Sequence, residues 1–273
     1  MKNFHTHTYL CKHAIGVPAD YIPIAAEHNC TALGFSDHCP YPDNTWIGMH
    51  MELYEQEQYR RMVTEAKTAA SFPVYFGYEC EWHKRFYSWY HDKLIYENGA
   101  EYLIYGPHWV NDGNDFLYVS EFNDKKTFMR YVDLTIEGMN SGLYAYIAHP
   151  DLFLESVSDV NDFYTDLCRQ IIRAAIDVNM PLEINGNGCI KEKVKRNGVL
   201  EYRYPVKKFW RLAQEMGARI IIAADAHDPA TLVSNMELAA DFAHKLDISY
   251  DANYEPKFYH RRERNETLSG ALC

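Results

Sequence analysis

Seven short apolar segments alternate with longer amphipathic segments along this 273-residue chain, and the alternation constrains the fold more than any other feature. The apolar segments, expected to be strands, are 2–5, 32–36, 74–79, 102–107, 145–148, 181–184 and 219–223. The amphipathic segments, expected to be helices, are 20–29, 51–71, 87–98, 125–140, 159–179, 206–216 and 231–246. Asn29, Gly99, Gly142 and Gly217 stand where four of these helices should end, as helix-terminating residues do.

Strands that alternate with helices favour parallel strands joined by right-handed crossovers. Seven such units predict an α/β fold that closes, or nearly closes, into a barrel. The chain contains no internal repeat, low-complexity tract or Pro/Ser-rich linker. We therefore expect a single domain over residues 1–273, with a polar tail from about residue 251 at the periphery.

Histidines and carboxylates gather where the predicted strands end. The residues that finish or follow a predicted strand include His5, Asp37, Glu79, His108, His149, Asn185 and Asp225. In a parallel barrel these strand ends meet on the face that carries the active site. Imidazole and carboxylate are ligands that divalent metals prefer. The pattern predicts a metalloenzyme that holds more than one metal ion.

His5 and His7 stand two residues apart at the end of the first predicted strand. Residues at this spacing in a strand point to the same face, so both rings can reach one ion. His13 follows in the next loop and can serve a neighbouring ion.

The set of motifs resembles the PHP (polymerase and histidinol phosphatase) family. The matching residues are HTHT at 5–8, SDH at 36–38, Glu79, His108, AHPD at 148–151 and ADAH at 224–227. The resemblance runs to about Pro229, and it implies a distorted (β/α)7 barrel with three divalent ions of Zn, Mn or Fe. It implies one sub-site of His5, His7, Glu79 and Asp225, a second of Glu79, His108 and His149, and a third of His13, His38 and His227.

Seven imidazoles and two carboxylates would leave three divalent ions with a large net positive charge. Such a site attracts a phosphate dianion and favours a metal-bridging hydroxide as the nucleophile near neutral pH. We therefore expect a metal-dependent phosphoester hydrolase, with Asp37, Glu79 and Asp225 as candidate catalytic residues. For Asp37, orientation of a ligand histidine is favoured over proton donation to the leaving alcohol.

The sixth strand and its loop resemble the histidinol-phosphatase branch of the family, through Asn185-Gly186-Asn187-Gly188, Lys191 and Tyr204-Pro205. This implies a small phosphorylated alcohol as substrate and a place in histidine biosynthesis. The candidate substrate-binding residues are Trp109, Asn185, Lys191, Arg196 and Arg203. Ile190 stands where the branch often has an arginine, so the phosphate contacts are expected to differ.

Other functions remain open on these residues. Within the same chemistry, the substrate could be a nucleotide, an oligonucleotide end or a phosphotyrosine. Outside it, a non-catalytic metal-binding module and a hydrolase of C–N bonds are the alternatives. Asp151 fits a helix cap as well as a substrate contact, and Glu81 fits the barrel rim as well as the pocket.

Charge and cysteine content limit the partners and the compartment. A net charge of −11 and a pI near 5.6 argue against broad binding to nucleic acid or membrane surfaces. The seven cysteines form no C-x-x-C pair, which is typical of a reducing cytosol. For Cys11, Cys39 and Cys80, a packing role is favoured over metal binding. No apolar run approaches the ~18 residues of a membrane span, so we expect a cytoplasmic protein; the oligomeric state stays open.

Overall fold

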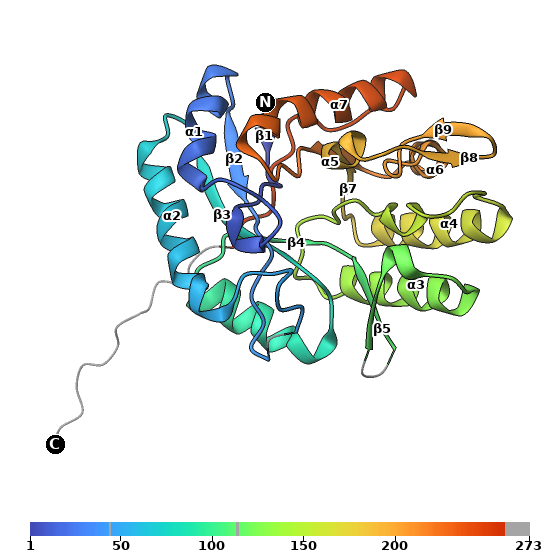
Figure 1. Ribbon diagram of the computed structural model, residues 1–273, viewed down its shortest axis with the longest axis horizontal. Helices are drawn as coiled ribbons and strands as arrows, with labels where there is room; N and C mark the ends of the chain where they lie inside the picture. Colours follow the sequence, from blue (N-terminus) through green and yellow to red (C-terminus); the bar gives the residue numbers. More distant parts are fainter. Residues whose placement is uncertain (44, 113–114, 260–273) are drawn as a thin grey trace.

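A ring of parallel chain segments forms the centre of the molecule (Figure 1). The structure is a computed structural model that describes residues 1–43, 45–112 and 115–259. The parallel strands are β1 (Lys2–Asn3), β2 (Ala32–Phe35), β3 (Val74–Cys80), β4 (Tyr102–Tyr105), β7 (Leu182–Asn185) and β10 (Ile220–Ala223). The first four pair in chain order, and β7 pairs with β10.

The ring closes through the fifth predicted strand and through β1. Single bridges join Tyr105 to Ile147, Ile147 to Leu182 and Thr6 to Ala226. Backbone hydrogen bonds from Ala145 to Leu103 (2.8 Å) and from Ile147 to Pro181 (3.1 Å) hold residues 145–148 on both sides. These pairings are too few for a regular ladder, and this irregularity distorts the barrel. The predicted distorted (β/α)7 architecture is confirmed.

The helices surround the strands, as Figure 1 shows for α1 and α2 on one side and α3 and α4 on the other. Their bounds are α1 (Pro18–Glu27), α2 (Gln56–Ala69), α3 (Lys125–Met139), α4 (Asp162–Asp177), α5 (Gly186–Ile190), α6 (Lys207–Glu215) and α7 (Leu232–Lys245). The predicted helix 87–98 is a π-helical segment, Trp89–Glu97. Short 3₁₀ turns occupy Tyr9–Cys11, Leu53–Glu55, Lys84–Phe86, Val119–Glu121, Leu152–Leu154 and Pro229–Thr231.

Capping residues explain where several helices begin and end. The Asp124 carboxylate accepts hydrogen bonds from the amides of Lys126 (2.8 Å) and Thr127 (3.1 Å) at the start of α3. The predicted stop residues Asn29 and Gly217 adopt φ angles of 55° and 77°. A left-handed residue ends a helix because it turns the chain out of the helical path.

Two antiparallel hairpins, absent from the predicted elements, lie in the connections that follow β4 and β7. They are β5 (Trp109–Asp112) with β6 (Asp115–Tyr118), and β8 (Val194–Arg196) with β9 (Val199–Glu201). Both lie within segments that connect a strand to a helix. They matter because residues from these connections line the functional site described below.

Aromatic side chains close the opposite end of the barrel. Phe4, Tyr102, Tyr146 and Tyr254 are buried in one cluster, against which Phe258 packs. Phe258 stacks on Tyr75 with ring centroids 4.2 Å apart. Residues 251–259 of the predicted peripheral tail therefore pack across the amino ends of the strands. The rest of that tail, 260–273, lies outside the described residues.

Among the helices of the described residues, none has the length and apolar character needed to cross a bilayer.

Candidate metal centre

The carboxyl ends of the strands place the predicted ligands around one cavity of about 510 Å³. The predicted ligands that line this cavity are His13, His38, Glu79, His108, His149, Asp225 and His227. His5 and His7 lie beneath it and are fully buried. All nine come from the ends of strands or from the loops that follow them, with His5, His7 and His13 after β1 and Asp225 and His227 after β10, so the barrel itself assembles the group.

Four ligand atoms converge at the floor of the site. His5 Nε2 lies 3.1 Å from His7 Nε2, 3.4 Å from Glu79 Oε2 and 3.3 Å from Asp225 Oδ1. His7 Nε2 lies 3.3 Å from the same Glu79 oxygen and 3.1 Å from the same Asp225 oxygen. Ligand atoms at about 2.0–2.2 Å from one ion in tetrahedral arrangement are about 3.3–3.6 Å from each other. The group therefore fits a divalent ion.

An unpartnered oxygen supports this fit. Asp225 Oδ1 is buried and makes no hydrogen bond, although His5 Nε2, His7 Nε2 and His227 Nδ1 lie within 3.4 Å of it. A buried carboxylate oxygen without a partner is costly in a folded protein. A metal ion between these atoms removes that cost.

The other oxygen of Glu79 belongs to a second group. Glu79 Oε1 lies 3.1 Å from His149 Nε2 and 3.9 Å from His108 Nε2. One carboxylate thus faces both groups, which is the bridging position implied by the family resemblance. Gly106 leaves the space for it, because a Cβ at this position would collide with Glu79 Oε1.

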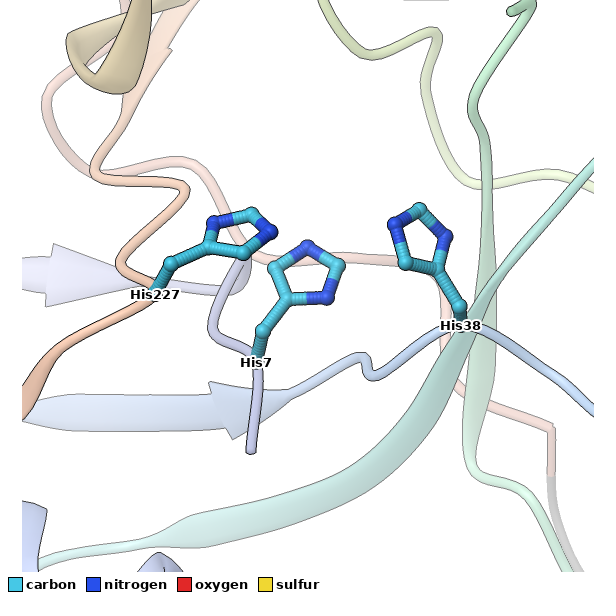
Figure 2. A group of neighbouring side chains, drawn as sticks. All are labelled: His7, His38 and His227. Atoms are coloured by element: carbon cyan, nitrogen blue, oxygen red, sulfur yellow. The ribbon is translucent and has the colours of Figure 1, made fainter. Parts of the chain in front are cut away.

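A third group shares His7 with the first one and so differs in part from the expected set of His13, His38 and His227. His7, His38 and His227 bring one nitrogen each into a common space (Figure 2). The rings of His7 and His227 stack with centroids 4.1 Å apart. His13 lies at the exposed edge, with its ring 4.9 Å from that of His227 and 5.2 Å from that of His38.

Cys11 contributes a further donor to this third group. Its buried sulfur lies within reach of His13 and His227, and also of His7 and Asp37. Cys11 was expected to serve in packing, and its surroundings also allow it to bind a metal ion.

Buried carboxylates hold the other ring nitrogen of three ligands. Glu183 Oε2 lies 2.9 Å from His5 Nδ1, Asp37 Oδ1 lies 3.3 Å from His7 Nδ1, and Glu81 Oε1 lies 2.5 Å from His108 Nδ1. Such partners fix the tautomer and turn Nε2 toward the metal. Asp37 also accepts hydrogen bonds from the Thr8 amide and hydroxyl, so the structure gives it an orienting geometry.

Two ligands have unusual backbone conformations. His149 has a φ of 30° and Asp225 a φ of 49°. Non-glycine residues seldom adopt positive φ, and such strain concentrates at functional sites. The strain here lies at the strand ends that deliver these two side chains to the centre.

The charges in the site are strongly coupled. Burial opposes protonation of His5, but the carboxylates of Asp225, Glu183 and Glu79 raise its pKa well above the usual value. Burial also opposes ionisation of Glu79, but His38, His5 and His108 hold its pKa well below the usual range. Because a histidine must lose its ring proton before that nitrogen can bind a metal ion, metal binding at this site should release protons.

Of the predicted substrate-binding residues, Trp109, Lys191 and Arg203 line the cavity. Asn185 does not; its side chain donates to Asp225 Oδ2 (3.0 Å) and to Glu183 Oε1 (2.6 Å), so it positions the metal centre. Asp151 accepts from the Val206 amide (2.5 Å) and from the Trp210 indole (2.9 Å) near the start of α6. Its side chain does not cap the turn Leu152–Leu154 that follows it, and it does not line the cavity.

The substrate-binding prediction for Arg196 needs correction. Its buried guanidinium donates to the carbonyls of Leu154 (2.8 Å), Val157 (3.0 Å) and Arg203 (2.7 Å), among others. It therefore ties the β8–β9 connection to the loop after Leu152–Leu154. Few of its donors remain for a ligand, and it does not line the cavity.

Sequence reasoning missed several residues of the site, of which Glu183, His50 and Glu155 are polar side chains close to the predicted ligands. Glu183 lies between Leu182 and Ile184, and strand periodicity could have placed it inside the barrel. His50 lines the cavity with its ring 4.6 Å from that of His38, and Glu155 lines it from the loop after residue 154. Neither stands at a strand end, so no signal pointed to them.

The fold and the site together define a barrel protein with clustered histidine and carboxylate side chains that could hold metal ions. The chain belongs to the PHP family, whose domain model matches residues 3–187.

A curated relative from Deinococcus radiodurans, a "Probable histidinol-phosphatase", is 26% identical over 239 residues, covering 82% of this chain and 85% of the relative. Two solved structures share the fold. One is of a Listeria monocytogenes protein described as a candidate histidinol phosphatase, at 17% identity, with a TM-score of 0.65 and coverage of 85% of this chain and 97% of that one. The other is the Lactococcus lactis histidinol phosphate phosphatase complexed with zinc, L-histidinol and phosphate. It is 15% identical, with a TM-score of 0.66 and coverage of 91% and 94%.

Proposed function

We propose that this protein is a metal-dependent phosphomonoesterase that hydrolyses a small phosphorylated alcohol, with L-histidinol phosphate as the first candidate. The observation that carries the proposal is the convergence of His5, His7, Glu79 and Asp225 at ligand-to-ligand distances of 3.1–3.4 Å. The similarity to the curated relative named for this activity supports the choice of substrate.

We further propose that three ions of Zn, Mn or Fe occupy the centre. The first would be held by His5, His7, Glu79 and Asp225, the second by Glu79, His108 and His149, and the third by His13, His38 and His227, with His7 and Cys11 as neighbouring donors. When bound, the ions supply Lewis acidity for the phosphoryl oxygens and activation of water.

The chain's own residues provide binding and orientation. Lys191 and Arg203 are cations on the cavity wall and would hold the phosphate oxygens that face away from the metals. Trp109 forms part of the wall against which the organic part of the substrate would pack. Glu183, Asp37 and Glu81 keep the ligand imidazoles turned inward throughout.

The test is phosphate release from L-histidinol phosphate beside p-nitrophenyl phosphate, a nucleotide and a short oligonucleotide. The protein is stripped of metal and then reloaded with Mn, Zn or Fe. We expect metal-dependent release with a large preference for L-histidinol phosphate. Release from other esters alone would remove this substrate but keep the chemistry. No release from any ester at full metal content would refute the phosphatase proposal.

A further inference from the structure

Glu155 is a buried carboxylate of the cavity wall that the proposed chemistry does not use. It follows the turn Leu152–Leu154, is 6% exposed and lines the same cavity as Glu79 and His108. Its Oε1 atom is buried without a hydrogen-bond partner. Among the described residues it belongs to none of the groups that could hold a metal. Glu155 Oε1 is therefore a hydrogen-bond acceptor without a donor, and binding of a ligand can supply that donor.

A phosphate dianion does not account for this carboxylate. Two negative groups that face each other across a cavity repel, so a pocket for phosphate alone would favour an apolar or cationic residue here. The cations for phosphate are already present in Lys191 and Arg203. Arg203 Nη1 lies 3.9 Å from Glu155 Oε2, which leaves Oε1 as the unpaired atom.

Aromatic side chains that line the same cavity indicate the charge of the ligand group that would bind Glu155. Trp109, Tyr118 and Tyr204 line the cavity together with Glu155. The rings of Trp109 and Tyr118 meet edge to face, with centroids 5.0 Å apart. The faces of aromatic rings attract cations, and a carboxylate attracts a cation more strongly than a ring does. Both features therefore suit a positively charged organic group.

We propose that Glu155 determines substrate specificity by binding a protonated amine, so that the substrates are phosphomonoesters of amino alcohols. This rests on the proposed function, because the phosphate end of such a molecule must lie at the metal centre. The ammonium group donates to Glu155 Oε1 while Lys191 and Arg203 face the phosphate. L-Histidinol phosphate carries such an amine.

The test compares L-histidinol phosphate with its deaminated counterpart, 3-(imidazol-4-yl)propyl phosphate, on the metal-loaded enzyme. We expect Glu155→Gln to lower kcat/KM for the amine substrate about 10- to 100-fold, as for the loss of a charged hydrogen bond. For the deaminated substrate the change should stay within about threefold. The matched control is Glu137→Gln, at an exposed glutamate of α3 that does not line the cavity, which should change neither value. Equal losses on both substrates would overturn the proposal and assign Glu155 to holding Arg203.

A binding measurement keeps this inference separate from the proposed function. Calorimetry follows L-histidinol and 3-(imidazol-4-yl)propanol binding to the metal-loaded wild type and to Glu155→Gln, after circular dichroism has shown that the variant is folded. We expect the wild type to bind the amine about 10-fold or more tightly than the deaminated alcohol, and the variant to lose this preference. If the wild type shows no preference, the inference is wrong. If it binds but hydrolyses neither ester, only the proposed function fails.

Discussion

Glu183 joins His5 to the rest of the barrel: its Oε2 atom lies 2.9 Å from His5 Nδ1, and both side chains are fully buried. The second oxygen, Oε1, accepts a hydrogen bond from Asn185 Nδ2 at 2.6 Å. Asn185 donates in turn to Asp225 Oδ2 at 3.0 Å. Two residues of β7 thus hold two ligands of the first group, His5 after β1 and Asp225 after β10.

Replacement of Glu183 should weaken metal binding without removing a ligand. In Glu183→Gln the side chain keeps its shape but loses the charge that holds His5 Nδ1–H. We expect the affinity of the first site to fall about 10- to 100-fold. Competition with a chelator measures it. The control is Glu201→Gln, on the partly exposed hairpin strand β9, and an unchanged affinity in Glu183→Gln would contradict the orienting role.

Glu79→Ala should lower the metal content more than His149→Ala does. Its two oxygens face different groups, Oε2 the pair His5 and His7, and Oε1 His149. Removal of a bridging carboxylate also leaves neighbouring ions without the anion that separates them. We expect metal analysis to show a loss of more than one ion per chain, against about one for His149→Ala. Equal losses would show that Glu79 does not bridge.

Gly106→Ala should damage the centre although position 106 carries no ligand. The added Cβ would collide with Glu79 Oε1 and push the carboxylate out of place. We expect loss of metal and of phosphatase activity, with circular dichroism unchanged. Gly217→Asn is the control, since its φ of 77° suits Asn and no atom lies near the added Cβ. A fully metallated Gly106→Ala would disprove this steric account.

The metal-free protein should lose stability as the pH rises from about 6.5 to about 9. Burial opposes protonation of His108, but Glu81 and Glu79 raise its pKa to about 9. A group with a raised folded pKa contributes stability that is complete below its unfolded value of about 6.5 and lost as the pH passes the folded one. Urea unfolding in the presence of a chelator measures this slope. Glu81→Gln should flatten it, and a slope unchanged by that substitution would refute the assignment.

Two arginines of the same connection should behave differently. Arg196→Met removes a buried guanidinium from several carbonyls, so we expect a loss of about 3 kcal/mol in the free energy of unfolding. Arg203→Met removes a half-exposed cation from the cavity wall and should raise KM with little change in stability. Urea unfolding and steady-state kinetics of both variants separate these effects. A raised KM in a stable Arg196→Met would restore its predicted substrate contact.

Much of the fold and the metal centre follows from the sequence alone. Apolar segments such as 74–79 and 219–223 are the right length for buried strands, and Asn29 and Gly217 end helices because they tolerate positive φ. The convergence of the predicted ligands could be expected because parallel strands must bring their carboxyl ends together. These are local patterns, and a local pattern is visible in a linear chain.

The tertiary structure alone decided which side chains face the cavity from the connecting loops. Arg196 and Arg203 lie seven residues apart on one polar segment, yet one is buried among carbonyls and the other lines the site. Glu155 and His50 reach the cavity from loops with no periodicity, and the tail 251–259 packs under the barrel. Loop direction is set by contacts between residues far apart in the chain, which no spacing along the sequence encodes.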